Sequence, residues 1–229
     1  MNEFERLEKI IGKDNINNLS NKTILVLGLG GVGGYVVESL ARSGIGNLII
    51  CDMDVVDKTN INRQIIALNS TIGKYKTDLF YDRIKDINPK CNVIKITKRI
   101  DLENYEELFK QHIDYFVDAC DTVTVKKIVI KTCIDKNIPI ISSMGTGNKF
   151  RPELLEIVDV RKTVNDPLAR IIRKYVKDEG IREKVMVLSS KELPKKIHTR
   201  TVGSTAFVPP SAGLLITSYI INEFLKEME

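Results

Sequence analysis

The chain of 229 residues is long enough for one large α/β domain and short for two full domains. Hydrophobic residues make up 43% and charged residues 28%, which is typical of a globular protein and excludes a disordered chain. The net charge of +5 does not by itself indicate a nucleic-acid-binding protein, and the cysteines form no CxxC pair, so no zinc site or disulfide framework is expected. The first ten residues carry charges of both signs, and the apolar stretch Gly213–Tyr219 is shorter than the roughly 20 residues of a membrane helix. We therefore expect a cytoplasmic protein with no transmembrane segment.

The chain up to Gly147 predicts strands that alternate with helices. The expected strands are 22–28, 47–52, 92–97, 114–120 and 138–143, and the expected helices are 31–43, 74–87, 102–111 and 123–136. This order predicts an α/β fold with a mostly parallel, Rossmann-like sheet covered by helices on both faces. Beyond Gly147 the pattern predicts strands at 153–162 and 183–192 and helices at 166–179 and 210–228. We interpret residues 1–229 as a single domain, with a nucleotide-binding core (1–147) and a C-terminal elaboration (148–229).

A glycine-rich loop joins the first expected strand to the first expected helix. Gly28, Gly30, Gly31 and Gly33 lie in the stretch GLGGVG, which fits the G-x-G-x-x-G pattern of nucleotide-binding βαβ units. Gly28 permits the tight turn, Gly30 and Gly31 let the backbone approach a phosphate, and Gly33 lets the helix pack on the strand. Asp52 ends the next strand, where a carboxylate accepts hydrogen bonds from ribose hydroxyls.

The residues that follow indicate whether the bound nucleotide is consumed as a substrate or retained as an NAD cofactor. The stretch TNINRQ contains Asn60, Arg63 and Gln64, and Lys76 follows in GKYK. Fixed cations stabilise the charge that develops when pyrophosphate departs, so Arg63 and Lys76 are candidate catalytic residues, with Asn60 and Gln64 as polar positioning groups. Two alternatives stay open, an NAD-dependent oxidoreductase and a non-catalytic nucleotide-binding module. Neither function explains why Arg63 and Lys76 occur together.

Two acidic residues follow a later strand in the stretch DACD. Ligands of open α/β sheets bind beyond the carboxyl ends of the strands, and Mg²⁺ prefers oxygen ligands that include phosphate. We interpret Asp118 as structural and predict Asp121 as a magnesium ligand, the alternative being a helix cap.

The chain resembles the ubiquitin-activating superfamily in its bacterial ThiF/MoeB branch. The resemblance rests on the order and spacing of the glycine loop, D-x-D, N-x-N-R-Q, G-x-x-K and D-x-x-D. The resemblance covers about Phe4 to Asp121 and implies adenylation of a carboxylate by ATP. Members of this branch commonly hold a four-cysteine zinc site, which this chain lacks, so no zinc is expected. The resemblance also implies that Asp54 joins the residues above in binding ATP or its magnesium ion, that the protein forms a homodimer and that sulfur-transfer proteins are possible partners. The family often has an R-F-x-R segment that reaches the partner subunit's ATP. Here Glu3 stands at the first arginine position and Arg6 at the second.

Three C-terminal stretches resemble the tRNA threonylcarbamoyladenosine dehydratases of this superfamily. They are KTVNDPLARIIRKYVKDEGI, VLSSKELP and GSTAFVPPSAGLLITSYIINEFL. The resemblance implies adenylation of the threonyl carboxylate of a modified adenosine beside the tRNA anticodon, followed by ring closure and release of AMP. Some members carry a cysteine where Met186 stands, so no essential thiol is expected. Activation of a ubiquitin-like sulfur-carrier protein is the closest alternative.

The charge distribution independently indicates an RNA substrate. Residues 149–200 hold 14 Lys and Arg against 8 Asp and Glu, a net charge of +6, which leaves about −1 for the rest of the chain. Arg170, Arg173, Lys174 and Lys177 recur at helical spacing, so they share one face, while Leu168, Ile171, Ile172 and Tyr175 are expected to pack elsewhere. We predict that these four cations bind tRNA phosphates; a solvated charged face is the alternative.

Overall fold

A computed structural model describes residues 3–196 and 201–226. Its strands are β1 (Thr23–Leu27), β2 (Asn47–Cys51), β3 (Asn92–Ile96), β4 (Tyr115–Asp118), β5 (Ile140–Ser143), β6 (Leu155–Asp159) and β7 (Met186–Ser190). Its α-helices are α1 (Glu5–Ile11), α2 (Lys13–Leu19), α3 (Gly33–Arg42), α4 (Lys76–Ile87), α5 (Val123–Asp135), α6 (Pro167–Asp178) and α7 (Val208–Lys226). In this part of the chain no helix is long and apolar enough to cross a membrane.

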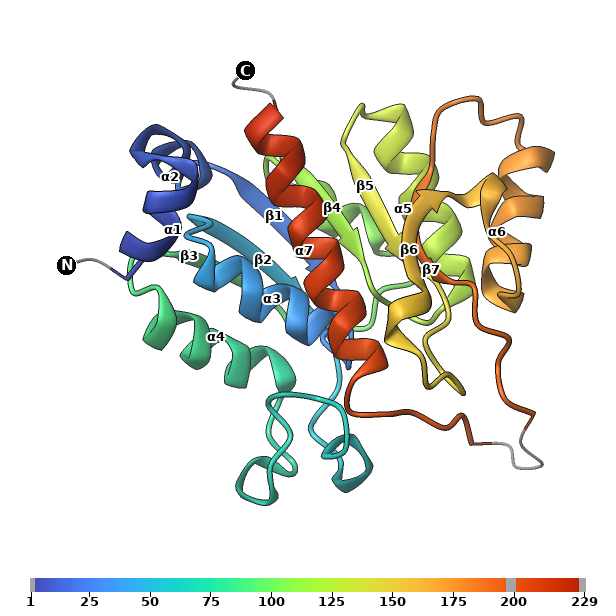
Figure 1. Cartoon of the computed structure of the whole chain (residues 1–229), viewed down its shortest axis with the longest axis horizontal. Coiled ribbons are helices and arrows are strands. Elements are labelled where there is room, and N and C mark those ends of the chain that lie inside the picture. Colours follow the sequence, from blue (N-terminus) through green and yellow to red (C-terminus); the bar gives the residue numbers. More distant parts are fainter. Residues whose placement is uncertain (1–2, 197–200, 227–229) are drawn as a thin grey trace.

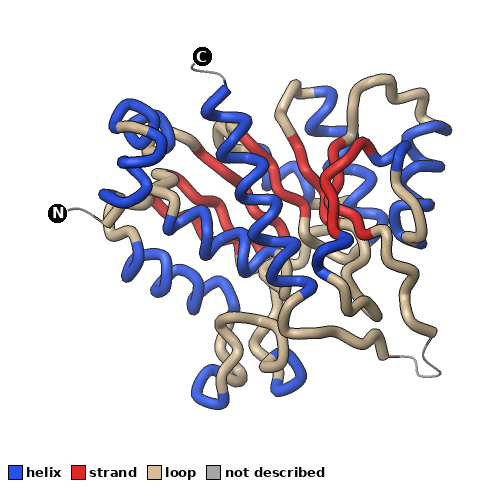
Figure 2. The backbone as a smooth tube through the Cα atoms, in the orientation of Figure 1, coloured by secondary structure: helices blue, strands red, loops and turns tan. Residues whose placement is uncertain are grey.

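The strands form one seven-stranded sheet in the order β3-β2-β1-β4-β5-β7-β6 (Figures 1 and 2). Every neighbouring pair is parallel except β6 and β7, which are antiparallel. The expected α/β fold with a mostly parallel sheet is therefore confirmed. The strand order reverses at β1, whose neighbours are β2 and β4, and ligands of open α/β sheets bind at such a reversal.

Both faces of the sheet are buried by helices, as a parallel sheet requires. Ile24 and Val26 of β1 belong to the apolar cluster that α3, α4 and α7 cover, whereas Leu25 and Leu27 face the cluster under α5 and α6. This alternation follows from the twofold side-chain period of a strand. In Figure 1, α7 crosses in front of the sheet beside α3. Gly213 allows this close packing, because a Cβ there would lie 2.5 Å from the carbonyl oxygen of Val32.

The expected helix at 102–111 is wrong in type and extent, because only Tyr105–Phe109 is helical and that turn is a 3-10 helix. Side chains compete with the backbone at its start. Asn104 accepts from the N–H of Asp101 and donates to the carbonyl of Arg99, and Asp101 accepts from the N–H of Glu103. Such local hydrogen bonds favour turns over an α-helix. The last helix begins at Val208, two residues before the expected start, and residues 227–229 at its expected end lie outside the described residues.

A fully buried ion pair joins the ends of β4 and β5 to α5. The Lys126 Nζ donates to the Asp118 carboxylate over 2.9 Å, to the Ser142 hydroxyl over 3.2 Å and to the Ser143 carbonyl over 2.8 Å. The Ser142 hydroxyl donates to the same carboxylate over 2.5 Å. All these groups are buried, so each charge depends on the others for solvation. The structural interpretation of Asp118 is therefore confirmed.

We expect Lys126→Met to lower the free energy of unfolding by about 3–5 kcal/mol, because Asp118 would be left as an unpaired buried charge. Urea denaturation measures the change. Lys131→Met on the same helix is the matched control, since Lys131 makes an exposed pair with Asp135, and its loss costs about 0.5 kcal/mol or less. Equal effects of the two substitutions would contradict the role given to the buried pair.

Candidate functional site

A cavity of about 930 Å³ opens beyond the carboxyl ends of the parallel strands. The residues predicted to contact a nucleotide come together there from separate segments: Gly28, Gly30, Gly31, Asp52, Asp54, Asn60, Arg63, Gln64, Lys76 and Asp121 all line it. The fold thus brings together residues that are up to 93 positions apart in the sequence, from Gly28 to Asp121. Gly33 and Arg6 are not among the lining residues.

The glycine loop is packed too tightly for larger residues at two of its positions. A Cβ on Gly33 would lie 1.8 Å from the Gly28 carbonyl oxygen, and Gly28 has a φ of +89° with Ala119 directly against it. Gly30 differs, because a Cβ there would meet only the Gln64 amide at 3.9 Å. The fold therefore requires glycine at 28 and 33 but leaves open space at Gly30. Among the described residues, no side chain caps the start of α3. The Gly34 and Tyr35 N–H groups donate to the Gly30 and Val32 carbonyls over 3.0 Å each, so an anion here would be bound by N–H groups that precede Gly34.

The Asp52 carboxylate is held in place by backbone donors. One oxygen accepts from the Leu29 N–H over 2.7 Å and the other from the Asp54 N–H over 2.8 Å. Each carboxylate oxygen has a second lone pair, so both can still accept from a hydroxyl group. This arrangement fits the ribose interaction predicted for Asp52.

Lys76 is a buried cation at the start of α4. Its Nζ lies 2.8 Å from an Asp54 oxygen and 3.7 Å from an Asp52 oxygen, and the residue is 4% exposed. Asp54, the more exposed of the two acids, therefore contacts Lys76 directly. The pairing fixes the ammonium group beside the cavity, where a phosphate can compete for it.

The segment between β2 and α4 supplies the second predicted cation and two amides. The Arg63 guanidinium donates to the Thr59 carbonyl and to the Asn62 side chain over 2.7 and 2.9 Å. The Asn60 oxygen accepts from the Asp57 N–H, so this amide shapes the short 3-10 turn η1 (Lys58–Asn60). The Gln64 Oε1 is buried and has no hydrogen-bond partner among residues 3–196 and 201–226. Because an unpaired buried polar atom is costly, Gln64 is the amide best placed to gain from a bound ligand.

Asp121 is exposed at the cavity, three residues beyond the end of β4. The residue at the N-cap of α5 is Thr122, and no side chain caps this helix, so Asp121 is not a helix cap. Among the described residues, no group of three or more His, Cys, Asp or Glu side chains could hold a metal ion by itself. Any metal at Asp121 must therefore take most of its ligands from elsewhere.

Three groups of lining residues were not predicted from the sequence. They are Lys98 and Arg99 after β3, Ser143–Gly147 at the end of β5 and beyond it, and Val202–Ser204, although Gly203 and Ser204 begin the stretch GSTAFVPPSAG, for which the resemblance suggests a role in covering the active site. The first two follow strands, so the rule that ligands bind beyond strand ends identifies them once the strand order is known. Val202–Ser204 carries no such signal. Its place depends on tertiary hydrogen bonds, in which Gly203 exchanges two with Asn148 and the Ser204 carbonyl accepts one from Asn62.

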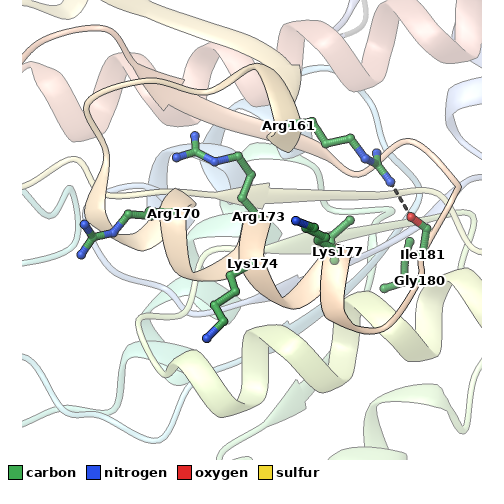
Figure 3. Close-up of a pocket in the computed structure, with 8 residues that line it drawn as sticks. Arg161, Arg170, Arg173, Lys174, Lys177, Gly180 and Ile181 are labelled. Carbon is green, nitrogen blue, oxygen red and sulfur yellow. Dashed lines mark hydrogen bonds between the residues drawn. The ribbon is translucent and has the colours of Figure 1, made fainter.

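A second, smaller hollow of about 620 Å³ lies along α6 (Figure 3). It is lined by the four predicted tRNA-binding residues, Arg170, Arg173, Lys174 and Lys177, and by Arg161. We call this hollow the α6 groove. Figure 3 shows Arg161 reaching across to the carbonyl of Ile181, which it contacts over 2.6 Å.

The helix differs from its predicted faces in two respects. Ile171 was expected to pack but is 42% exposed, because it lies at the border of the buried face formed by Ala169, Ile172 and Val176. Arg173 lines the α6 groove but also donates to the carbonyl and hydroxyl of Thr163, so part of its charge is used within the fold.

A buried ion pair connects the start of α6 to the loop around Gly145, which lines the cavity. The Lys149 Nζ donates to the Asp166 carboxylate over 3.1 Å and to the Gly145 carbonyl over 2.6 Å, and Asp166 caps α6 at the Ala169 N–H. Leu168 of α6 lines the cavity, and Arg170, about 3 Å further along the helix axis, lines the α6 groove. Residues of α6 therefore line both hollows, from opposite sides of the helix.

Comparisons with known proteins agree with this arrangement. Residues 4–161 match the ThiF family. The chain is 42% identical over 246 residues to the tRNA threonylcarbamoyladenosine dehydratase of Bacillus subtilis, with 100% of this chain and 97% of the relative covered. It is 34% identical over 176 residues to the enzyme of the same name from Escherichia coli, covering 77% and 66% of the two chains.

Solved structures of the Escherichia coli dehydratase, TcdA, share the whole fold. The complex with AMP superposes with a TM-score of 0.93 at 29% identity, covering 99% of this chain and 95% of that one. The complex with ATP gives a TM-score of 0.92 at 29% identity with the same coverage. The matching family, the extent of these similarities and the assembled cavity lead to one conclusion: this chain belongs to the ThiF family.

Proposed function

We propose that this chain is an ATP-dependent tRNA threonylcarbamoyladenosine dehydratase. The observation that carries the proposal is the cavity at the strand reversal, where a glycine loop, two cations and an exposed carboxylate converge. Relatives of that name align over nearly the full length, and the similar TcdA structures hold ATP or AMP. The helix that contributes Leu168 to the cavity also carries the basic α6 groove, which suits a tRNA substrate better than a carrier protein.

The nucleotide-contacting residues have distinct roles in this proposal. The glycine loop and the start of α3 contact the phosphates of ATP, since N–H groups and the positive helix end favour anions there. Asp52 accepts from the ribose hydroxyls. Lys76 leaves Asp54 for a phosphate, and Arg63 turns from its local partners toward the departing pyrophosphate. Asn60 and Gln64 orient the phosphates that Lys76 and Arg63 contact.

The chemistry proceeds in two displacement steps. A threonyl carboxylate oxygen attacks the α-phosphorus of ATP, and the bond from that phosphorus to the bridging oxygen breaks, which releases pyrophosphate. The carbamoyl group of the same modified adenosine then attacks the acyl carbon, loses a proton and expels AMP with the former carboxylate oxygen. The tRNA product is lighter by one water. Fixed cations lower the barrier of the first step by stabilising the departing charge.

Asp121 fits a magnesium ion that arrives with ATP. Mg²⁺ commonly binds nucleotides through one or two carboxylates together with phosphate oxygens and water, and Asp121 offers one exposed carboxylate at the cavity. When bound, the ion neutralises phosphate charge. No zinc site enters the proposal.

The thiols of the chain support a mechanism without a covalent thioester. Burial raises the pKa of Cys51 to about 12 and that of Cys91 to about 11, and it also raises the pKa of Cys120 and of Cys133. These cysteines are therefore protonated at neutral pH and are poor nucleophiles. Met186, where some relatives carry a cysteine, begins β7. Ring closure within one molecule needs no thioester, because proximity alone gives a large effective concentration.

We also propose a homodimer in which Arg6 serves the partner subunit's cavity. Arg6 is exposed on α1 and does not line the cavity of its own chain. The segment 53–75, which projects at the bottom of Figure 1, exposes a run of large apolar side chains: Met53, Val55, Ile61, Leu68, Ile72 and Tyr75. Such an exposed apolar patch is typical of a protein interface. The cytoplasmic location and the sulfur-transfer partners implied by the family are part of the same proposal.

Incubation with ATP, Mg²⁺ and one carboxylate at a time tests the proposal. An anticodon stem-loop carrying threonylcarbamoyladenosine is expected to yield AMP and a nucleoside lighter by one water. A carrier protein with a free C-terminal carboxylate is expected to yield no adenylate. Adenylation of the carrier protein alone would favour the alternative activity, and no nucleotide turnover with any carboxylate would contradict the proposal.

Gly30→Ala tests the phosphate-binding role of the glycine loop. We expect the free energy of unfolding to stay within about 1 kcal/mol of wild type, because the added Cβ meets no close neighbour. ATP affinity measured by calorimetry is expected to fall at least about tenfold, since the methyl group occupies the space of a phosphate. Gly33→Ala, whose Cβ overlaps the Gly28 carbonyl oxygen, is expected to destabilise the fold itself. Normal ATP binding by a folded Gly30→Ala protein would refute this role.

Asp121→Ala is expected to abolish AMP formation while leaving the fold intact, because Asp121 is exposed and caps no helix. The loss of a metal ligand should cost about two orders of magnitude or more in the rate of AMP release. Asp86→Ala, an exposed carboxylate on α4, is the matched control. Wild-type turnover by the Asp121 variant would exclude the magnesium role.

Replacement of Arg170, Lys174 and Lys177 together by glutamine tests the α6 groove; Arg173 is kept because it bonds to Thr163. We expect weaker tRNA binding and a salt dependence of the affinity whose slope falls by about 2 to 3, with ATP affinity unchanged. Glutamine at the exposed Lys90, Lys110 and Lys136 changes the net charge equally and serves as the control. The same slope in both triple variants would identify the groove as a solvated charged face.

A further inference from the structure

An exposed aromatic pair lies beside the cavity but does not line it. The rings of Phe150 and Phe207 meet edge to face, with centroids 4.8 Å apart and an interplanar angle of 88°. Phe150 is 55% exposed and Phe207 38%, so Phe150 is the most exposed of the described phenylalanine and tyrosine residues. The fold therefore keeps a large apolar ring in contact with water instead of burying it in the core.

The backbone that carries Phe150 is fixed by a buried carboxylate. Glu192, which follows β7, accepts hydrogen bonds from the Phe150 N–H over 2.9 and 3.0 Å and from the Arg151 N–H over 2.8 Å. This contact also accounts for the glutamate in the stretch VLSSKELP. A ring held on a fixed backbone loses little conformational entropy when a ligand packs against it.

A lysine side chain lies over the ring. The Lys195 Nζ lies 5.1 Å from the centre of the Phe150 ring, and the Lys195 N–H donates to the Asn148 carbonyl over 2.7 Å. Arg151, the next residue after Phe150, is exposed and forms an ion pair with Glu153 over 2.7 Å, and Lys196, the next residue after Lys195, is exposed. An exposed cation over an aromatic ring gains little, so Lys195 can leave the ring when a stronger stacking partner and a phosphate are present.

The position of the ring connects it to the cavity. Gly147 lines the cavity, and Phe150 follows it by three residues, which spans at most about 11 Å between Cα atoms. Asn148 links this segment to Gly203, another lining residue, through two hydrogen bonds of 2.6 and 2.8 Å. A ligand that places one reacting group in the cavity can therefore place a neighbouring group on Phe150.

We infer that Phe150, supported by Phe207 and Lys195, is a stacking platform for a nucleobase of the anticodon loop next to the modified adenosine. Single-stranded RNA loops are commonly bound by stacking on aromatic side chains, with nearby cations on the phosphates. A second protein chain fits this surface less well, because lysine is depleted at the centre of protein interfaces and the more extensive apolar surface lies in segment 53–75. The inference rests on the proposed tRNA substrate and adds a recognition site to it.

The test uses an anticodon stem-loop that carries threonylcarbamoyladenosine and a stacking-sensitive fluorescent purine at the neighbouring position. Phe150→Ala and Phe150→Leu both remove the aromatic face, whereas Phe150→Tyr keeps it, and Leu102→Ala, an exposed apolar residue elsewhere, is the control. We expect the Ala and Leu variants to bind the stem-loop about fivefold to 150-fold more weakly and to lose the fluorescence quenching seen with wild type. Tyr is expected to preserve both, and ATP affinity is expected to be unchanged in all variants.

The salt dependence separates this platform from the α6 groove. Stacking releases no counterions, so Phe150→Ala should leave the slope of affinity against salt unchanged, unlike the loss of cations from α6. Wild-type affinity and quenching in the Ala variant would overturn the inference while leaving the proposed function intact. A changed sedimentation behaviour with unchanged RNA affinity would identify a protein interface and would also overturn it. Failure of the wild-type protein itself to bind or dehydrate the stem-loop would contradict the proposed function and the platform together.

Discussion

The buried ion pair between Asp118 and Lys126 is the interaction on which the geometry of the cavity depends most. It joins β4, β5 and α5 next to Ser143, the last residue of β5, and next to the loop that carries Cys120 and Asp121. Because neither charge reaches water, the pair is stable only when the strand ends and the helix keep their relative positions. The Cys120 N–H also donates to Asp118, which fixes the backbone just before the exposed Asp121.

A second buried pair, Lys149 with Asp166, extends this rigid frame toward α6. It fastens the Gly145 carbonyl to the start of α6, and the same carboxylate caps that helix. The nucleotide cavity and the α6 groove therefore share one support. In the proposed tRNA complex, the RNA would therefore contact two surfaces that are both fixed to the start of α6.

Much of the fold follows from local patterns in the sequence. The glycine loop, the strand ends and the acids after them are determined by short-range signals, so the β1–α3 unit and the positions of Asp52 and Asp121 could be predicted. The expected helix at 102–111 failed because Asp101 and Asn104 bind the backbone locally, which periodicity does not reveal.

Long-range contacts set the remaining features of the site, and the sequence pattern does not encode them visibly. The pairing of Lys76 with Asp54, the bond of Arg173 to Thr163 and the place of Val202–Ser204 at the cavity each join segments that are separate along the chain. Phe150 looks like an ordinary apolar residue until Glu192 is seen to hold its backbone at the surface. Such features need the tertiary structure.

The central claim is that the threonyl carboxylate becomes an acyl-adenylate in the cavity. Its most direct test places a heavy oxygen isotope in that carboxylate of a modified anticodon stem-loop and follows the label by mass spectrometry after one turnover with ATP and Mg²⁺. The account predicts that one labelled oxygen appears in the phosphate of AMP, because the carboxylate oxygen stays on the α-phosphorus when the ring closes. Label found in pyrophosphate or in water, with none in AMP, would contradict it.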